Sequence, residues 1–448
     1  MKEKPDGSKK LFSSGFNKFS KNFLDIYKLY KLKKSIRYAY NNAPFYKKLF
    51  KKNNIQPDDI KSFSDLPRIP CTRPEDLEND PKAFFSVPEN RFVKVFTTAG
   101  TTGSPKKAYF TKEDIDSIVL FVATGGKILY NITQRDRIRL TFEVGYATEL
   151  WGTSYILDRA YGKGIGALTL STGRLPVKNE LEILREYKPN IIGDVTSRIN
   201  YLTNEMTKIC DVKELGVQKF LIGAEPTTNA MRKRIEQTWN ADVFIGYGIN
   251  EVGLLMAGEC EEKNGMHLSE MNYLLEVIDP ETNEQLEDGE VGELLYTTFD
   301  RMGMPLIRYN SHDLGKVIPG MCRCGLPLRR IVIKGRTDDM IPIGAGDNLF
   351  SNMFDEAMFK IPEVIEYNVI FDREDGKDTI TILAECRKTN NSIRKKIFNA
   401  VVEIPKIKDG IQKSKTIGIP KITLVQPNTF DRNSIKMKRI IDNRNLYE

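Results

Sequence analysis

Residues Thr97-Thr98-Ala99-Gly100-Thr101-Thr102-Gly103-Ser104-Pro105-Lys106 follow an apolar segment, 92–97, that is typical of a β-strand. The two glycines and the run of hydroxyl side chains allow backbone N–H and side-chain O–H groups to surround a polyphosphate, and Lys106 adds positive charge. The spacing differs from that of the P-loop, whose lysine and hydroxyl residue stand at a helix start. We predict a strand followed by a phosphate-binding loop; a polar surface loop is the alternative for this stretch alone.

Beyond this loop, short apolar segments alternate with stretches of helical pattern. The predicted strands are 137–142, 165–170, 190–192, 219–222 and 242–245. Strands separated by helices predict an α/β sheet with much parallel pairing. The segment 273–296 instead predicts a β-hairpin, because its apolar strands flank turn signals at Asp279-Pro280 and Asp288-Gly289.

The pattern changes again after Gly335, where strands at 364–370, 379–384 and 421–425 accompany a helix at 393–402. This is typical of a small α+β domain. We therefore expect an α/β protein with three parts: a basic helical arm of residues 1–52, a large α/β domain of mixed sheets at 53–337, and a small carboxyl-terminal domain at 338–448.

The net charge of +8 is concentrated in the arm. Residues 1–52 contain fourteen lysines and one arginine against Glu3, Asp6 and Asp25, a local charge of +12, so the rest of the chain carries −4. The arm is predicted to be an amphipathic helix that ends at 41–44, with a packed apolar stripe. That stripe consists of Phe16, Phe19, Phe23, Ile26, Tyr27 and Tyr30. Contact with a membrane surface or polyanion is the alternative use of such a helix.

Length and composition exclude several classes of protein. The chain has 448 residues, 40% apolar and 29% charged, as in a soluble globular protein. Its longest apolar stretch, 118–123, is far shorter than the roughly 18 to 20 residues of a membrane span. The amino terminus has no apolar segment behind its charges, so we expect a cytoplasmic protein. The acidic body argues against nucleic-acid binding. With only His267 and His312, most hydrolase mechanisms lack their usual base.

Four cysteine and histidine residues have the spacing of a metal site. Cys260 and His267 precede the predicted hairpin, and Cys322 and Cys324 follow it. Three thiolates and an imidazole form a closed set of four ligands for structural zinc, provided that turns bring both pairs to one side. Four unrelated reduced residues are the alternative. The remaining cysteines have no partner in the sequence: Cys71, Cys210 and Cys386.

Five further motifs follow in order: Gly223-Ala224-Glu225-Pro226, Tyr247-Gly248-Ile249-Asn250-Glu251, Arg308-Tyr309-Asn310-Ser311-His312-Asp313, Gly335-Arg336-Thr337-Asp338-Asp339 and Ser434-Ile435-Lys436. In this order and spacing, the chain resembles the adenylate-forming superfamily of acyl-CoA synthetases and adenylation domains. Segments 35–46 and 304–309 resemble its phenylacetate-CoA ligase branch. The likeness runs from about residue 33 to the end.

The resemblance implies an ATP site. Tyr247 would lie against the adenine, Asp313 would accept the ribose hydroxyls, and Glu251 would bind the Mg²⁺ that bridges the phosphates. Arg336 would contact the nucleotide from the domain junction. The phosphate-binding loop would contribute Thr98, Gly100, Thr101, Thr102, Gly103, Ser104 and Lys106. The other implied ATP-binding residues are Gly223, Ala224, Glu225, Gly248 and Asn250.

The resemblance also implies a mobile small domain. Asp338 resembles its hinge residue, and Lys436 resembles its catalytic lysine, which bridges the substrate carboxylate and the α-phosphate. Lys438 is a rival for this role, because Ile435 stands where the family has glycine. Tyr146 and Trp151 would line the acyl pocket, where flat apolar walls suit an aromatic or short apolar acid. Both are equally compatible with core positions.

The implied reaction joins a small carboxylic acid to AMP and then transfers the acyl group to a thiol. Coenzyme A is the favoured thiol; an acidic carrier protein docked on the arm, an amine or a cofactor is the alternative acceptor. Polyanion binding through the arm is a hypothesis of another class, and an oligomer is compatible with the sequence. Attack by a carboxylate releases no proton, so positioned positive charge can supply the catalysis in a chain with two histidines.

Three departures from the family pattern lie near the nucleotide. His312 replaces the glycine before the ribose-binding carboxylate, and Asn250 replaces threonine or serine before Glu251. The loop at 340–347 is also altered. These changes leave an unusual reaction or an inactive site as an alternative.

Overall fold

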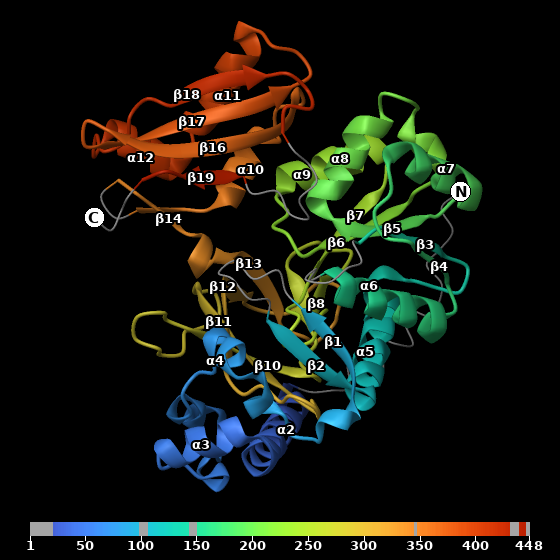
Figure 1. Cartoon of the computed structure of the whole chain (residues 1–448), viewed down its shortest axis with the longest axis vertical. Coiled ribbons are helices and arrows are strands. Elements are labelled where there is room, and N and C mark those ends of the chain that lie inside the picture. Colours follow the sequence, from blue (N-terminus) through green and yellow to red (C-terminus); the bar gives the residue numbers. More distant parts are fainter. Residues whose placement is uncertain (1–20, 98–105, 143–149, 345–346, 431–438, 445–448) are drawn as a thin grey trace. The chain divides into compact units, whose positions relative to one another are not determined.

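The computed structural model describes residues 21–97, 106–142, 150–344, 347–430 and 439–444 (Figure 1). The chain divides into two compact units. Unit 1 consists of Met1–Leu175, Pro189–Gly193 and Phe244–Lys334, and unit 2 consists of Pro176–Lys188, Asp194–Val243 and Gly335–Glu448. Each unit has its own hydrophobic core. The predicted division into arm, large domain and small domain stays a prediction.

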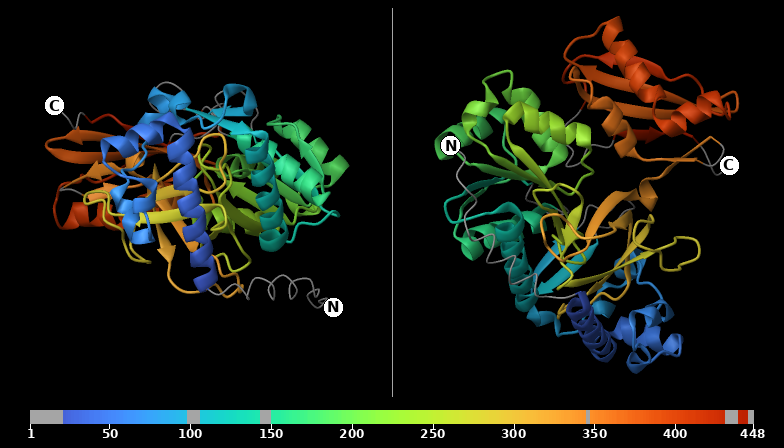
Figure 2. Two further views of the ribbon diagram at one scale, coloured as in Figure 1. Left: turned by 90° about the horizontal axis from the view of Figure 1, so that it is seen from below. Right: turned by 180° about the vertical axis from the view of Figure 1, so that it is seen from behind.

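Unit 1 begins with two neighbouring helices, α2 (Lys21–Asn42) and α3 (Pro44–Lys52), drawn in blue in Figure 2. Pro44 occupies the first turn of α3, where its missing N–H costs nothing. Leu32 and Ile36 of α2 and Phe50 of α3 are fully buried in the first core. This part of the arm is therefore built into unit 1.

The helical prediction for the arm is confirmed from Lys21 onward, and half-buried Tyr27 donates its hydroxyl to the carbonyl of Met271, but the predicted packed stripe is wrong at Phe23, Ile26 and Tyr30. Phe23, Ile26 and Tyr30 are 49%, 68% and 63% exposed, whereas Leu24 and Lys28 are buried. The inward face is shifted because Lys28 forms an ion pair with buried Glu270 at 2.9 Å, a tertiary contact that helical periodicity does not report. Phe16 and Phe19 lie outside the described residues.

The strands that lie wholly or partly in unit 1 include both parallel and antiparallel pairs. Antiparallel pairs join β10 to β11, β11 to β12, β13 to β9, β9 to β8, and β8 to β7. The predicted hairpin is confirmed as the β10–β11 pair, and the predicted parallel pairing is confirmed where β3 lies between β4 and β5. Their bounds are β3 (Arg137–Leu140), β4 (Leu168–Ser171), β5 (Ile191–Val195), β7 (Asp242–Tyr247), β8 (Ala257–Glu259), β9 (Met266–Leu268), β10 (Tyr273–Ile278), β11 (Gly292–Thr298), β12 (Tyr309–Ile318) and β13 (Arg330–Arg336).

A separate antiparallel hairpin precedes the longest helix of the α/β part. Its strands are β1 (Phe92–Thr97) and β2 (Lys107–Thr111), and the predicted phosphate-binding loop connects them. Thr111 ends β2 and caps α5 (Lys112–Tyr130), accepting from the backbone of Asp114 while the Asp114 side chain accepts from the backbone of Thr111. In the described part of unit 1, the other α-helices are α4 (Pro74–Asn79) and α6 (Leu150–Asp158).

Unit 2 consists of three segments of the chain. The first contains α7 (Val177–Tyr187), and the second contains α8 (Thr196–Met206), β6 (Lys219–Gly223) and α9 (Asn229–Trp239). The third contains β14 (Ile341–Ile343), β15 (Asp347–Leu349), α10 (Ser351–Met358), β16 (Val364–Glu374), β17 (Lys377–Cys386), α11 (Asn391–Val402), α12 (Pro405–Gln412), β18 (Lys421–Val425) and β19 (Ile440–Asp442). Ala230 and Met231 of α9 share the second core with the residues after 340.

The carboxyl-terminal sheet has the strand order β18-β17-β16-β19. Its central strands are antiparallel and each outer strand is parallel to its neighbour. Helices α10, α11 and α12 contribute Phe354, Ile397 and Ile407 to its core. The α+β character predicted for this segment is confirmed. Among the residues that the structure describes, no helix is both long and apolar enough to cross a membrane.

Candidate active site

Lys106 directly precedes strand β2 of the β1–β2 hairpin. Its Nζ atom is 3.5 Å from Oε1 of Glu78 and 3.9 Å from Oε1 of Glu251. The sequence predicted the lysine and Glu251, but it contained no signal for Glu78, which reaches the site from α4. The predicted loop residues Thr98, Gly100, Thr101, Thr102, Gly103 and Ser104 lie outside the described residues.

A tight turn after β7 carries the second predicted motif. Met256 donates its backbone N–H to the carbonyl of Tyr247 at 2.7 Å, which closes the turn. A Cβ atom on Gly248 would lie 1.8 Å from the carbonyl oxygen of Leu254, so only glycine fits at this position. Gly248 is therefore needed because the backbone of Leu254 approaches it closely.

The side chains of this turn reach the neighbouring strands. Glu251 is buried, and the hydroxyl of Tyr309 in β12 donates to its Oε1 over 3.5 Å. Asn250 is also buried and donates from Nδ2 to the carbonyl of Thr97 at 3.3 Å. Asn250 thus holds the last residue of β1, directly before the predicted phosphate-binding loop.

Tyr247 and Asp313 form a second pair in the same unit. The Tyr247 hydroxyl donates to Oδ2 of Asp313 at 2.5 Å, and the Tyr296 hydroxyl lies 3.4 Å from that of Tyr247. Burial, followed by the negative charge of Asp313, raises the pKa of Tyr247 well above its usual value. Tyr247 therefore remains a neutral donor that orients the carboxylate at neutral pH.

His312, one of the departures from the family pattern, has a left-handed backbone with φ of +59°. A residue with a Cβ pays roughly 1 kcal/mol for this conformation, which explains why glycine suits the position. The imidazole lies between two carboxylates, with Nδ1 3.9 Å from Oε1 of Glu293 and Nε2 3.9 Å from Oε1 of Glu75. The Asn310 side chain also accepts the backbone N–H of His312 at 2.8 Å.

Other predicted site residues belong to unit 2. Gly223 ends β6, Ala224 has a left-handed φ of +63°, and Glu225 accepts hydrogen bonds from both the backbone and the hydroxyl of Ser197 at 2.9 Å. Arg336 ends β13, and the backbone of Asp338 lies in the short 3₁₀ turn Thr337–Asp339. Their predicted roles stay predictions.

Lys436, its rival Lys438 and the acyl-pocket residue Tyr146 lie outside the described residues. Trp151 lies in α6. The catalytic lysine and the acyl pocket therefore stay predictions.

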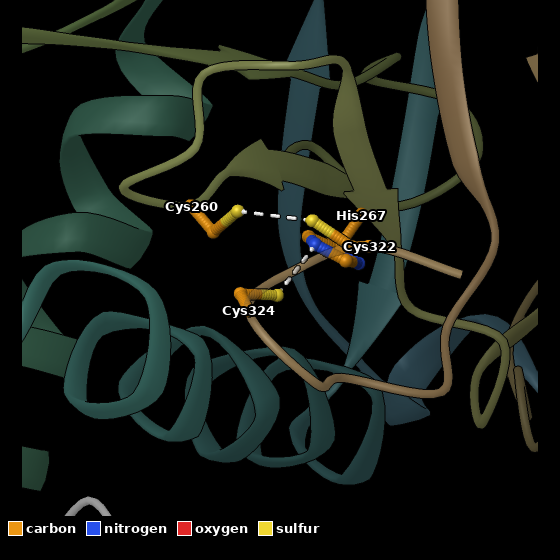
Figure 3. Close-up of side chains that lie close together, drawn as sticks. All are labelled: Cys260, His267, Cys322 and Cys324. Carbon is orange, nitrogen blue, oxygen red and sulfur yellow. Dashed lines mark hydrogen bonds between the residues drawn. The ribbon is translucent and has the colours of Figure 1, made fainter.

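The four predicted zinc ligands come together in unit 1 (Figure 3). Their ligand atoms all lie within 4.8 Å of one another. Sγ of Cys260 is 3.6 Å from Sγ of Cys322, and Sγ of Cys324 is 3.3 Å from Nε2 of His267. Strand β9 carries His267 beside β13, and this pairing brings the two halves of the cluster together. The prediction that turns place both pairs on one side is confirmed.

One sulfur–sulfur separation in the cluster is compatible with a tetrahedral zinc ion. Zinc–sulfur bonds of about 2.3 Å imply sulfur–sulfur separations of about 3.8 Å, near the observed value. Nδ1 of His267 lies 3.2 Å from the carbonyl of Leu328, a partner that leaves Nε2 to face the thiols. A hydrogen bond from Cys324 lowers the pKa of the Cys260 thiol, so the cluster favours a thiolate.

Comparison with known proteins identifies two matching family models. The model of the AMP-binding enzyme family matches residues 32–299, and that of the AMP-binding enzyme C-terminal domain matches residues 346–444. A phenylacetate-coenzyme A ligase of Aromatoleum evansii is 33% identical over 446 residues, covering 95% of this chain and 96% of the relative. Another, from Pseudomonas putida, is 30% identical over 433 residues, covering 93% and 94%.

A solved structure shares the fold. A 2-hydroxyisobutyryl-CoA ligase in complex with 2-HIB-AMP, in the postadenylation state, superimposes with a TM-score of 0.82. It is 23% identical in sequence, and the match covers 94% of this chain and 90% of that one. At this identity the likeness supports the large α/β part with a separate carboxyl-terminal domain.

The turn after β7 gives a test of the site's architecture. Gly248→Ala is expected to lower the free energy of unfolding by about 2 kcal/mol or more, because the new methyl group would overlap the Leu254 carbonyl. Gly125→Ala in α5 is the matched control, since nothing lies within 4 Å of its Cβ position. This control is expected to raise the free energy of unfolding by about 0.5 to 1 kcal/mol. Urea denaturation measures both, and equal effects would contradict the close approach.

Proposed function

Because the chain belongs to the AMP-binding enzyme family, we propose that it is an ATP-dependent acid–thiol ligase. It activates an aryl or arylacetic acid as an acyl-adenylate and transfers the acyl group to coenzyme A. The observation that carries the proposal is the position of Lys106, the last residue of the predicted phosphate-binding sequence, 3.9 Å from Glu251. The phenylacetate-coenzyme A ligases, similar over nearly the whole chain, support the acid and the thiol.

In the first step, the substrate carboxylate attacks the α-phosphorus of ATP, and the bond to pyrophosphate breaks. No proton is removed, so the barrier comes mainly from bringing anions together. Lys106 and the loop donors would neutralise phosphate oxygens, and Lys436 would bridge the carboxylate and the α-phosphate. Glu251 would hold Mg²⁺, a hard cation that prefers carboxylate oxygens and supplies further positive charge to the phosphates.

The adenosine end of ATP would be bound by the Tyr247–Asp313 pair. A carboxylate is a pure acceptor and suits the ribose hydroxyls, while the ring of Tyr247 suits the adenine face. The hydrogen bond from Tyr247 to Asp313 orients the carboxylate before the nucleotide arrives. In the second step, the thiol of coenzyme A attacks the acyl carbon and AMP leaves.

The central test is acid-dependent pyrophosphate release across aryl, arylacetic, fatty and amino acids, with and without coenzyme A. We expect aryl or arylacetic acids to be preferred and a thioester to form with coenzyme A. A preference for fatty or amino acids would contradict the substrate class. Pyrophosphate release without thioester formation would favour a carrier protein or amine as acceptor, and no release with any acid would contradict acid activation.

The role of Lys436 can be separated from that of Lys438. Lys436→Ala is expected to slow adenylate formation by about 10²-fold or more, because its charge acts on the transferring group. ATP binding, measured by calorimetry, should change little. Lys438→Ala is the matched control and should retain most activity. Normal pyrophosphate release by Lys436→Ala, together with loss in Lys438→Ala, would assign the catalytic role to Lys438.

We also propose that the cluster of Cys260, His267, Cys322 and Cys324 binds one structural zinc ion. Four protein ligands leave no open coordination position, so the ion would not take part in the reaction. Cys260 directly follows β8, and Cys322 and Cys324 lie in the connection between β12 and β13. The ion would therefore clamp these two connections within unit 1.

Metal analysis of protein purified without chelator tests the zinc proposal. We expect close to one equivalent of zinc, since a closed structural site should be nearly full. Cys324→Ser should lose the metal and unfold at lower temperature. Cys210→Ser, outside the cluster, should keep the zinc content and the unfolding temperature of the unaltered protein. Less than about half an equivalent in the unaltered protein would rule out the proposal.

A further inference from the structure

The guanidinium group of Arg301 connects two segments of the site. The side chain is 4% exposed and extends from the segment that follows β11. Its Nη1 donates to the carbonyls of Glu251 and Val252 at 3.0 and 2.9 Å, and its Nη2 donates to the carbonyl of Tyr109 at 3.2 Å. The turn that carries Glu251 is therefore joined to β2 by one side chain.

The guanidinium group of Arg301 also contacts an aromatic ring and a carboxylate. Its Cζ atom lies 3.9 Å from the ring centroid of Phe110, close enough for a cation–π interaction. Its Nε is 3.9 Å from Oδ2 of Asp114 at the start of α5. The Asp114 carboxylate accepts the backbone N–H groups of Met302 and Gly303 at 2.7 and 3.1 Å, which fixes the segment next to the arginine.

Burial of this charge is costly in the absence of partners. Desolvation lowers the pKa of Arg301, opposed by electrostatic interactions with Asp114, then Tyr273 and then Glu251. An arginine remains protonated at neutral pH even so. The three carbonyls, the ring and the carboxylate compensate for the lost hydration, so the side chain has one well-determined position.

We propose that Arg301 is a positioning residue for the ATP–magnesium site. It holds the backbone of Glu251 at a fixed place relative to β2, the strand that begins directly after Lys106. The carboxylate expected to bind Mg²⁺ and the lysine expected to bind phosphate therefore keep their spacing. This inference rests on the proposed function, and it concerns a residue that would touch neither ATP nor the metal.

An arginine is suited to this task and a lysine is not. The planar guanidinium presents donors on separate nitrogens, so Nη1 and Nη2 reach two segments at once. The ammonium group of a lysine has all its donors on one nitrogen at the end of a flexible stem. It would therefore bind the carbonyls of one segment only. Arg301→Lys retains the charge and most of the volume but is expected to loosen the link between Glu251 and Tyr109.

A matched control is available in the same unit. Arg330 is also buried, and it donates to the carbonyls of Asn264, in the β8–β9 connection, and Gly320, in the β12–β13 connection, both at 3.2 Å. Loss of this side chain removes comparable hydrogen bonds without touching the β7 turn. A purely structural role for Arg301 predicts that Arg301→Met and Arg330→Met behave alike.

The experiment measures ATP binding by calorimetry at a series of Mg²⁺ concentrations. The variants are Arg301→Lys, Arg301→Met and Arg330→Met. Partners behind a metal ligand typically change metal affinity by about 10- to 100-fold. We expect the Mg²⁺ concentration for half-maximal ATP binding to rise about tenfold in Arg301→Met, to rise less in Arg301→Lys, and to stay within about twofold in Arg330→Met.

The outcomes separate this inference from the proposed function. An unaltered protein that binds no ATP at any Mg²⁺ concentration would overturn both. Normal ATP binding with equal Mg²⁺ dependence in the Arg301 and Arg330 variants would overturn only the positioning role. If Arg301→Met does not fold, Arg301→Lys decides the question, and an unchanged Mg²⁺ dependence in that variant overturns the inference.

Discussion

The close backbone approach between Gly248 and Leu254 is the constraint on which the site depends. It allows the chain to reverse after β7 within a few residues, and the reversal is closed by the hydrogen bond from Met256 to Tyr247. Tyr247, Asn250 and Glu251 are thereby carried on one turn. Asn250 then contacts β1, Tyr247 contacts Asp313 in β12, and the turn itself is held from β2 through Arg301. A small displacement of this turn would move all of these contacts together.

Segment 304–309, one of those that indicated the phenylacetate-CoA ligase branch, has a structural explanation in unit 1. Arg308 is buried, has a left-handed φ of +49°, and donates from Nε to both carboxylate oxygens of Glu276 in β10 at 3.0 and 3.2 Å. Burial raises the pKa of Glu276, although Arg308 opposes the shift. The next residue, Tyr309, directs its hydroxyl toward Glu251. The motif thus joins the core of the large sheet to the carboxylate expected to bind metal.

Much of this arrangement could be predicted from the sequence, because its signals are local. Turn residues marked the β10–β11 hairpin, and alternation of strands and helices marked the parallel pairs around β3. The spacing of Cys260 and His267, and of Cys322 and Cys324, predicted the cluster. Short antiparallel strands leave few ways to arrange these two pairs. The contacts of Glu78 and Arg301 could not be predicted, because nothing local relates them to Lys106 or Glu251. The exposed face of α2 was misassigned for the same reason: the ion pair of Lys28 with Glu270 links residues 242 positions apart.

The departures from the family pattern now have different physical meanings. Asn250 is buried and binds a backbone carbonyl of β1, so its amide serves the scaffold of the turn. His312 tolerates a left-handed backbone that favours glycine, and Glu75 and Glu293 lie at either side of its ring. The carboxylate of Asp313, next in the chain, nevertheless retains an ordered donor in Tyr247. Both substitutions are therefore accommodated by neighbouring groups. Asp313, expected to bind the ribose, and Glu251, expected to bind Mg²⁺, remain in place. This argues for retained nucleotide chemistry.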